Sequence, residues 1–217
     1  MSRYKAGLLF GVSAYVLWGA FPLYWPLLKP AHAVEIVAHR AIWTLVFCLA
    51  VLAFKRQIGK TLRIAKDGRV ALRLLAASVL VSINWLVYIW ATNHGHVVES
   101  ALGYYINPLI MITFGVFLLK EKLRPLQWTA VAIASVGVLV LTIDYGRLPW
   151  IALGLAFSWG TYGLVKKRLN LGALEGLTIE TAFAFIPYSA YLIILQSRGE
   201  GYFGSSLGLT LLLASAG

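Results

Sequence analysis

The run SALGYYINPLIMITFGVFLL, residues 100–119, contains no charged side chain over 20 residues. A helix needs about 20 apolar residues to cross the hydrocarbon core of a bilayer. Asn107 and Pro108 interrupt this otherwise apolar run, so it is predicted to be a membrane helix with a polar point inside it. Comparable charge-free runs cover residues 6–28, 74–98, 125–143, 148–165 and 181–197.

The composition of the whole chain is typical of a membrane protein. Hydrophobic residues make up 60% and charged residues 12%, whereas soluble domains carry about 25% charged residues. Spans of this length must be helices, because lipid offers no partner for an unpaired backbone group and barrel strands are shorter. With residues 34–54 included, the sequence predicts an all-α polytopic membrane protein with seven full spans, and residues 206–217 begin an eighth.

The basic residues predict the orientation, because cytoplasmic loops of membrane proteins are rich in Lys and Arg. A cytoplasmic N-terminus puts 15 of the 19 Lys and Arg residues inside, seven of them in an inner loop at residues 55–73. These residues would face lipid headgroups, so the net charge of +11 does not indicate nucleic-acid binding. The four left outside are Lys29, Arg40, Arg147 and Arg198.

Two similar segments predict an internal repeat. LWGAFPL at residues 17–23 and SWGTYGL at residues 158–164 share a Trp-Gly pair followed by an aromatic residue, at an offset of 141 residues. The same offset places His39 over Glu180. The first copy would start inside and the second outside, which gives the inverted repeat found in many secondary transporters.

Four motifs resemble the RarD-type permeases of the EamA branch in the drug/metabolite transporter superfamily. They are YVLWGAFPLYW at 15–25, EIVAHRAIW at 35–43, INWLVYIWA at 83–91 and VVESALGYYINPLIMITFGVFLLKEKLRPLQW at 97–128. The resemblance implies a bundle of ten helices in two inverted five-helix repeats, with a substrate cavity between the halves and both ends in the cytoplasm. Members are bacterial inner-membrane proteins linked to the export of metabolites or drugs, including a chloramphenicol label.

Compared with that family pattern, residues 1–143 are predicted to form the first five-helix repeat. Residues 144–217 are predicted to form an incomplete second repeat with helices six, seven and the start of eight. The expected partners are therefore a small-molecule substrate, the lipid bilayer, and either a second copy in a homodimer or a missing C-terminal half.

Polar and aromatic side chains on one face of the third span predict part of a substrate cavity. At 100° per residue, Asn84, Trp85 and Tyr88 share this face with serine and threonine residues. The alternative is hydrogen bonding between helices, worth about 0.6 kcal/mol per contact. Trp18 continues the small-residue stripe of Gly7 and Gly11, so it is expected at the cavity edge. Small-residue stripes on the first and fifth spans, the latter with Gly137, predict close helix packing.

Tyr104, Asn107 and Pro108 are predicted to belong to the same site. Pro108 has no amide hydrogen, so the Tyr104 carbonyl loses its helical bond. Asn107 would lie about 10 Å below the outer end of the span, facing Asn84 and Trp85 across the cavity, and the proline would flex during transport. The alternative is a packed kink with Asn107 bonded to a neighbouring helix.

Ionisable residues at membrane depth are candidates for coupling. Glu35 and His39 share a helical face with Arg40 beside them, which predicts either an ion pair or proton-coupling site, or charged groups reaching to the interface. Glu180 is their counterpart in the repeat, or a charge at a helix N-terminus.

The sequence does not indicate an enzyme, a cofactor or a metal site. It contains no GxSxG or HExxH motif, and its two Asp residues lie in predicted loops. His94 and His96 lack further ligands at suitable spacing, and Cys48 is the single cysteine. The sequence therefore predicts a permease or exporter of small neutral or amphipathic molecules, with a non-transporting membrane assembly or binding partner as the alternative.

Overall fold

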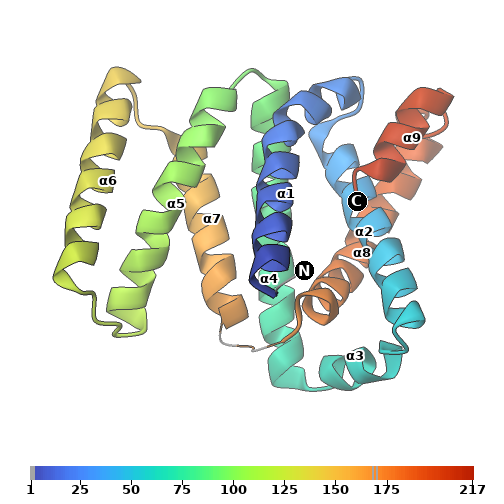
Figure 1. Ribbon diagram of the computed structural model, residues 1–217. Helices are drawn as coiled ribbons and strands as arrows, with labels where there is room; N and C mark the ends of the chain where they lie inside the picture. The colour runs from blue at the N-terminus through green and yellow to red at the C-terminus, as the bar shows by residue number, and fades with distance from the viewer. Residues whose placement is uncertain (1–2, 168, 170) are drawn as a thin grey trace.

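The computed structural model describes residues 3–167, 169 and 171–217. All regular secondary structure within this part is helical, which confirms the predicted all-α class (Figure 1). In chain order the elements are α1 (Arg3–Tyr24), the 3₁₀ helix η1 (Trp25–Leu28), α2 (Ala33–Phe54), α3 (Ile58–Ala65), α4 (Gly68–Asn93), α5 (Val97–Leu118), α6 (Pro125–Asp144), α7 (Trp150–Lys167), α8 (Ala173–Ser197) and α9 (Leu207–Ser215).

Six stretches of the described chain are long and apolar enough to cross a membrane: α1 with η1, α2, α4, α5, α6 and α8. The sequence predicts seven, and α7 is the one that is not among the six. This helix has 18 residues and ends in Lys166 and Lys167. Its polar residues make α7 less hydrophobic than the neighbouring helices. Two of them, Ser158 and Tyr162, form hydrogen bonds inside the protein.

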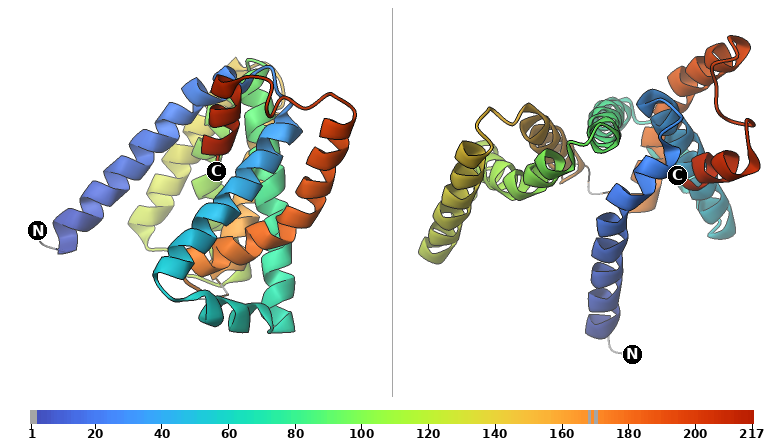
Figure 2. Two further views of the ribbon diagram at one scale, coloured as in Figure 1. Left: turned by 90° about the vertical axis from the view of Figure 1, so that its right-hand side faces the viewer. Right: turned by 90° about the horizontal axis from the view of Figure 1, so that it is seen from above.

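Helix α7 lies between α4 and α5 and packs along both, while α8 packs along α2 and α4 (Figures 1 and 2). Small residues make the α5–α7 contact close. A Cβ atom added at Gly103 of α5 would lie 3.0 Å from the backbone oxygen of Ala152. Leu102 and Ile106 of α5 are buried with Ala152 and Ala156 of α7 in the same cluster.

The small-residue stripes on α1 and α6 do not pack as the sequence predicted. A Cβ atom at Gly7, Gly11 or Gly137 would meet no atom within 4 Å. Figure 2 shows α1 projecting away from the other helices, and α6 has no buried residue. Both helices present apolar faces to their surroundings, as membrane helices that contact lipid do.

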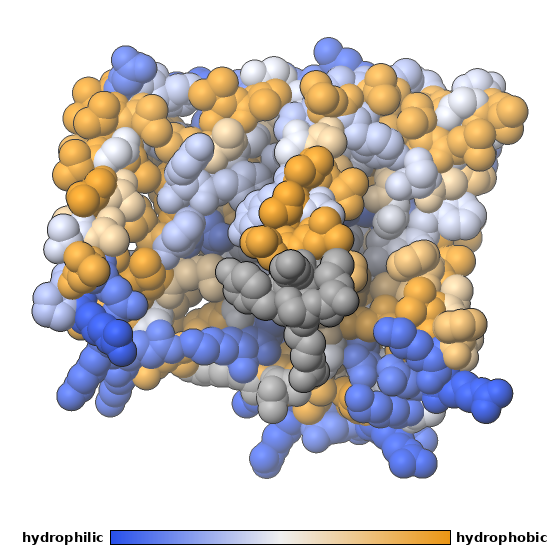
Figure 3. All heavy atoms as spheres, in the orientation of Figure 1, coloured by the Kyte–Doolittle hydropathy of each residue, from blue (hydrophilic) through white to orange (hydrophobic). Residues whose placement is uncertain are grey.

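Hydrophilic surface gathers along one edge of the molecule (Figure 3). Figure 1 places α3, the α5–α6 connection and the C-terminal end of α7 at this edge, and the N-terminal end of α1 points toward the same side. Several basic residues that were predicted to be cytoplasmic lie here, among them Lys60 and Arg63 of α3 and Lys120, Lys122 and Arg124 of the α5–α6 connection. The arrangement supports a cytoplasmic N-terminus, which stays a prediction.

The helix directions agree with an inverted repeat. In Figure 1, α1 and α7 run in opposite directions, and so do α2 and α8. Trp18 and Trp159, which the repeat places in equivalent positions, touch edge to face with ring centroids 6.5 Å apart. The division into repeats at residues 1–143 and 144–217 stays a prediction.

Candidate substrate-binding site

Asn84 of α4 points to α7 rather than across to α5. Its side-chain Nδ2 donates to the Leu155 backbone oxygen at 3.1 Å and to Ser158 Oγ at 2.9 Å. Because α7 lies between α4 and α5, the structure does not bring Asn84 to Asn107. For Asn84 the structure therefore shows the alternative, a hydrogen bond between helices.

Asn107 lies half-buried on α5, and its Oδ1 atom is buried without a hydrogen-bond partner in the described part of the chain. Helix α5 continues past Pro108, which is exposed. One turn earlier, Tyr104 meets Tyr88 of α4 edge to face, with ring centroids 5.8 Å apart. The structure thus brings Tyr88 and Tyr104 together, whereas in the described residues Asn107 Oδ1 has no bond to a neighbouring helix.

Arg40 of α2 lies among aromatic rings from three other elements. Its guanidinium carbon is 4.4 Å from the ring centre of Trp85, 5.2 Å from that of Trp25 and 5.5 Å from that of Phe21. Contacts at this range are attractive, because the faces of aromatic rings carry negative potential. We call Arg40 with these three rings the Arg40 cage.

The Arg40 cage corrects the prediction of an ion pair among Glu35, His39 and Arg40. Glu35 Oε1 instead accepts the Tyr202 backbone N–H at 2.7 Å, and the His39 ring stacks on Phe203 at 4.7 Å. His39, four residues after Glu35, lies about 40° from it around the helix axis, whereas Arg40, five residues after Glu35, lies about 140° from it. Arg40 therefore points to a different side of α2 from Glu35.

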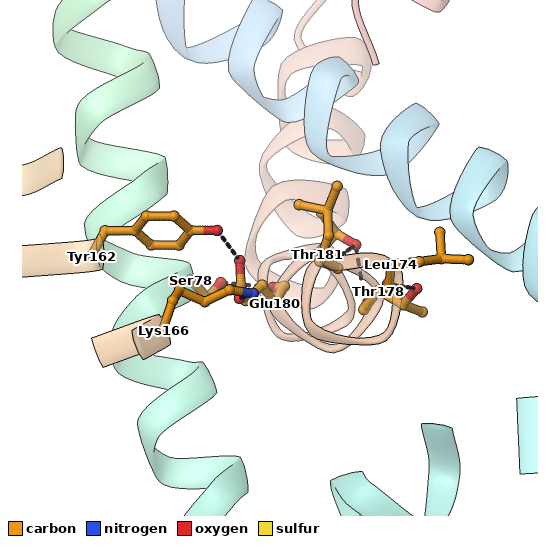
Figure 4. A network of polar contacts seen from close by, with 8 residues as sticks. Ser78, Tyr162, Lys166, Leu174, Thr178, Glu180 and Thr181 are labelled. Atoms are coloured by element: carbon orange, nitrogen blue, oxygen red, sulfur yellow. Dashed lines mark hydrogen bonds and ion pairs between the residues drawn. The ribbon is translucent and has the colours of Figure 1, made fainter. Parts of the chain in front are cut away.

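Glu180 of α8 forms a buried ion pair with α7 (Figure 4). Its Oε1 lies 2.6 Å from Lys166 Nζ, and its Oε2 accepts from the Tyr162 hydroxyl at 3.1 Å. Ser78 of α4 donates to the Glu180 backbone oxygen at 2.7 Å. Because α8 begins at Ala173, Glu180 lies well past the first turn, so of the two alternatives the position does not fit a helix N-terminal charge.

Trp18 lies on α1 at the edge of the helix assembly. Half of its side chain is exposed, and its ring contacts Trp159 of α7 and Tyr15 of its own helix. Trp18 is not part of the Arg40 cage. The residue of α1 that contacts Arg40 is Phe21, one turn further along the helix.

A cavity of about 450 Å³ adjoins the Arg40 cage between α2, α4 and α8. Arg40 is the one charged side chain in its lining. The lining residues are Arg40, Thr44, Phe47, Cys48, Trp85, Ala173, Leu174, Leu177 and Gly217.

A larger hollow of about 1020 Å³ lies at the opposite edge, where α2 begins and α4 ends. Its lining includes Lys29, His32, Trp90 and His94. No predicted site residue lines it, so its size alone does not make it the better candidate. In the described residues, no group of three His, Cys, Asp or Glu side chains is arranged to hold a metal ion.

Sequence reasoning missed Phe21 and Trp25 of the cage and the Lys166–Tyr162 pair that meets Glu180. The spacing of Tyr162 and Lys166, four residues apart on one helical face, could have identified the second set. Nothing in the sequence indicates that Phe21 and Trp25 lie against Arg40.

A bundle of apolar helices with buried polar groups and a cavity between them is the architecture of a multi-pass membrane transporter. Residues 5–143 match the EamA-like transporter family. The chain belongs to this family of transporters, and it is not an enzyme.

Sequence similarity to curated relatives covers nearly the whole chain. The chain is 52% identical to "Protein RarD" of Streptomyces exfoliatus, over 98% of this chain and 68% of that protein. It is 47% identical to "Uncharacterized transporter YojE" of Bacillus subtilis, over 98% of this chain and 72% of that protein. It is 32% identical to "Chloramphenicol-sensitive protein RarD" of Pseudomonas aeruginosa, over 90% of this chain and 67% of that protein. No solved structure matches the chain.

Proposed function

We propose that the protein is a secondary permease or exporter of small neutral or amphipathic metabolites or drugs. The observation that carries this proposal is the cavity beside the Arg40 cage, whose lining is mostly apolar with one charged side chain. Its volume of about 450 Å³ lies within the range of roughly 300–1,000 Å³ typical of sites for small organic molecules. A phosphate-bearing substrate would call for more than one cationic group.

The proposed substrate site includes Trp85 in the cavity wall, with Tyr88 and Tyr104 next to it. Asn107 contributes a buried oxygen that lacks a partner, and Pro108 is the proposed flexing point of α5. Coupling to an ion or proton is assigned to the buried acids, Glu35 of α2 and Glu180 of α8, with His39 one helical turn from Glu35.

We place the protein in the bacterial inner membrane with the N-terminus in the cytoplasm. This finer location rests on the basic edge of the molecule and on the bacterial origin of its relatives.

Flux into vesicles tests the proposal. Purified protein is reconstituted in proteoliposomes, and uptake of radiolabelled chloramphenicol and a panel of small amphipathic solutes is compared with that of protein-free vesicles. Chloramphenicol is included because one relative bears its name. At least one solute should equilibrate faster with the protein present, and rates equal to those of protein-free vesicles for the whole panel would contradict the proposal.

A matched pair of variants locates the pathway. Trp85→Leu alters the cavity wall and should lower the flux, whereas Trp90→Leu should not. Trp90 lies on the same helix, partly exposed, and stacks on His94 and His96 outside the cavity. Equal loss in both variants would assign the effect to general damage.

The alternative function is that of a membrane assembly or binding partner without transport. It is favoured by α6, which has no buried residue, and by α1, whose small residues face open space. Cross-linking between copies in the membrane, together with absence of flux for every solute, would support this alternative.

A further inference from the structure

We propose that the Arg40 cage recognises a carboxylate, so that the preferred substrates are small organic acids with an apolar or aromatic body. This inference deepens the proposed function, on whose cavity it rests. It narrows the amphipathic substrate class to molecules with a single negative charge.

The first observation is a charge without a counter-charge. The four salt bridges among the described residues use other cations, namely Lys60, Arg147, Lys166 and Lys167. The acid nearest in sequence, Glu35, is occupied by the backbone N–H of Tyr202. A cation held away from water without a counter-ion is unfavourable, and a bound anion would relieve that cost.

The second observation is a set of unused donors. A guanidinium has five N–H donors in a planar fork that matches a carboxylate. In the described part of the chain, Arg40 donates one hydrogen bond, from Nη1 to the Ala216 backbone oxygen at 3.3 Å. Its Nε atom is buried and has no hydrogen-bond partner. The oxygen of Ala216, at the C-terminal end of α9, shows that an oxygen acceptor fits beside the guanidinium.

The third observation is the placement of the rings. Trp85 is the closest of them, and it lines the cavity together with Arg40. A ligand carboxylate that reaches Arg40 from the cavity would therefore lay its apolar part against Trp85, Phe47 and Leu177. The cavity offers one charged side chain, a cation, and a mostly apolar wall, which complement a monoanion with an apolar body.

The test compares two molecules of nearly the same shape. Phenylacetate carries the charge, and phenylacetamide replaces it with a neutral amide. Binding of radiolabelled phenylacetate to the purified chain is measured at equilibrium, with each unlabelled molecule as competitor. We expect phenylacetate to compete at least about 10-fold better, as for hydrogen bonds to a charged group. Equal competition in the unmodified protein would overturn the inference.

Two variants and one control attribute the preference to the guanidinium. Arg40→Gln should remove the preference for the acid, whereas Arg40→Lys, which keeps the charge but loses the fork, should retain part of it. Arg198→Gln serves as the control, because Arg198 lies at the exposed C-terminal end of α8. An acid preference that survives in a folded Arg40→Gln protein would overturn the inference, and the unmodified protein provides the decisive comparison if that variant does not fold.

Flux and binding together separate the two proposals. Binding with an acid preference but without flux of any solute would contradict transport and leave the carboxylate site standing. Flux of neutral solutes without an acid preference would contradict the carboxylate site and leave transport standing.

Discussion

At the scale of single residues, the fold buries charges in two different ways. Glu180 has its counter-ion in Lys166 at 2.6 Å and a hydrogen bond from Tyr162. Arg40 has aromatic rings in place of a counter-ion. Removing Glu180 or Lys166 therefore leaves a charge without its partner. Arg40, in contrast, keeps hydrogen-bond donors free for an anion.

The Glu180–Lys166 pair predicts a large effect on stability. Glu180→Gln leaves the Lys166 ammonium without its counter-ion beside a buried position, and breaking a buried pair costs about 3–5 kcal/mol. Partial exposure of Lys166, at 21%, puts the expected loss at the lower end of that range. The midpoint of thermal unfolding in detergent should therefore fall clearly below that of the unmodified protein.

The exposed pair of Lys167 and Glu121 provides the matched control. Both side chains are about half exposed or more, and such pairs are worth roughly 0–1 kcal/mol. Glu121→Gln should therefore leave the unfolding midpoint nearly unchanged. Similar losses in Glu180→Gln and Glu121→Gln would show that burial of the Glu180 pair does not matter.

At the scale of helices, the α5–α7 contact depends on the absence of a side chain at Gly103. Besides the Ala152 oxygen, an added Cβ atom would meet Leu155 Cβ at 3.1 Å and Ala152 Cα at 3.2 Å. These atoms belong to the backbone or lie directly on it, so they have little freedom to move away.

We therefore predict that Gly103→Val separates α5 from α7 and destabilises the protein. Overpacking of this kind typically costs about 1–3 kcal/mol. The same substitution at Gly137 of α6, where nothing lies within 4 Å, should be tolerated. Thermal unfolding of both variants measures the difference, and a tolerated Gly103→Val would contradict the close α5–α7 packing.

The helix scale also explains which parts of the site could be predicted from sequence. Periodicity places Asn84, Trp85 and Tyr88 on neighbouring sides of α4, but it does not reveal which helix they face. Asn84 bonds α7 because α7 lies between α4 and α5, which only the tertiary arrangement decides. The Arg40 cage was missed for the same reason, since its three rings come from α1, η1 and α4 and meet Arg40 of α2 only in the folded chain.

At the scale of the whole molecule, composition and segment length predicted the helical membrane fold directly. Charge-free runs in this chain are too long for other structures in lipid. Family membership also followed from motifs that are contiguous in sequence, and it was confirmed over residues 5–143. The one predicted span that the structure does not count as long and apolar enough is α7, whose polar side chains contact other helices rather than lipid.

The orientation in the membrane is a further prediction at this scale. In a protein whose Cys48 is replaced by Ala, Lys60→Cys on α3 should react with a membrane-impermeant maleimide in inverted vesicles and not in intact cells. Arg147→Cys, in the exposed connection between α6 and α7, should react in intact cells. The opposite pattern would reverse the proposed topology.

The central claim, that substrate occupies the cavity beside the Arg40 cage, is tested most directly by protection of a cysteine introduced as Phe47→Cys. Phe47 lines the cavity and is exposed, and replacing the single cysteine, Cys48, by Ala leaves the introduced thiol as the one that reacts. Its alkylation by a membrane-permeant maleimide is timed with increasing concentrations of a solute that the protein transports. The account predicts that alkylation slows with a concentration dependence matching that of transport; an unchanged rate while transport saturates would contradict it.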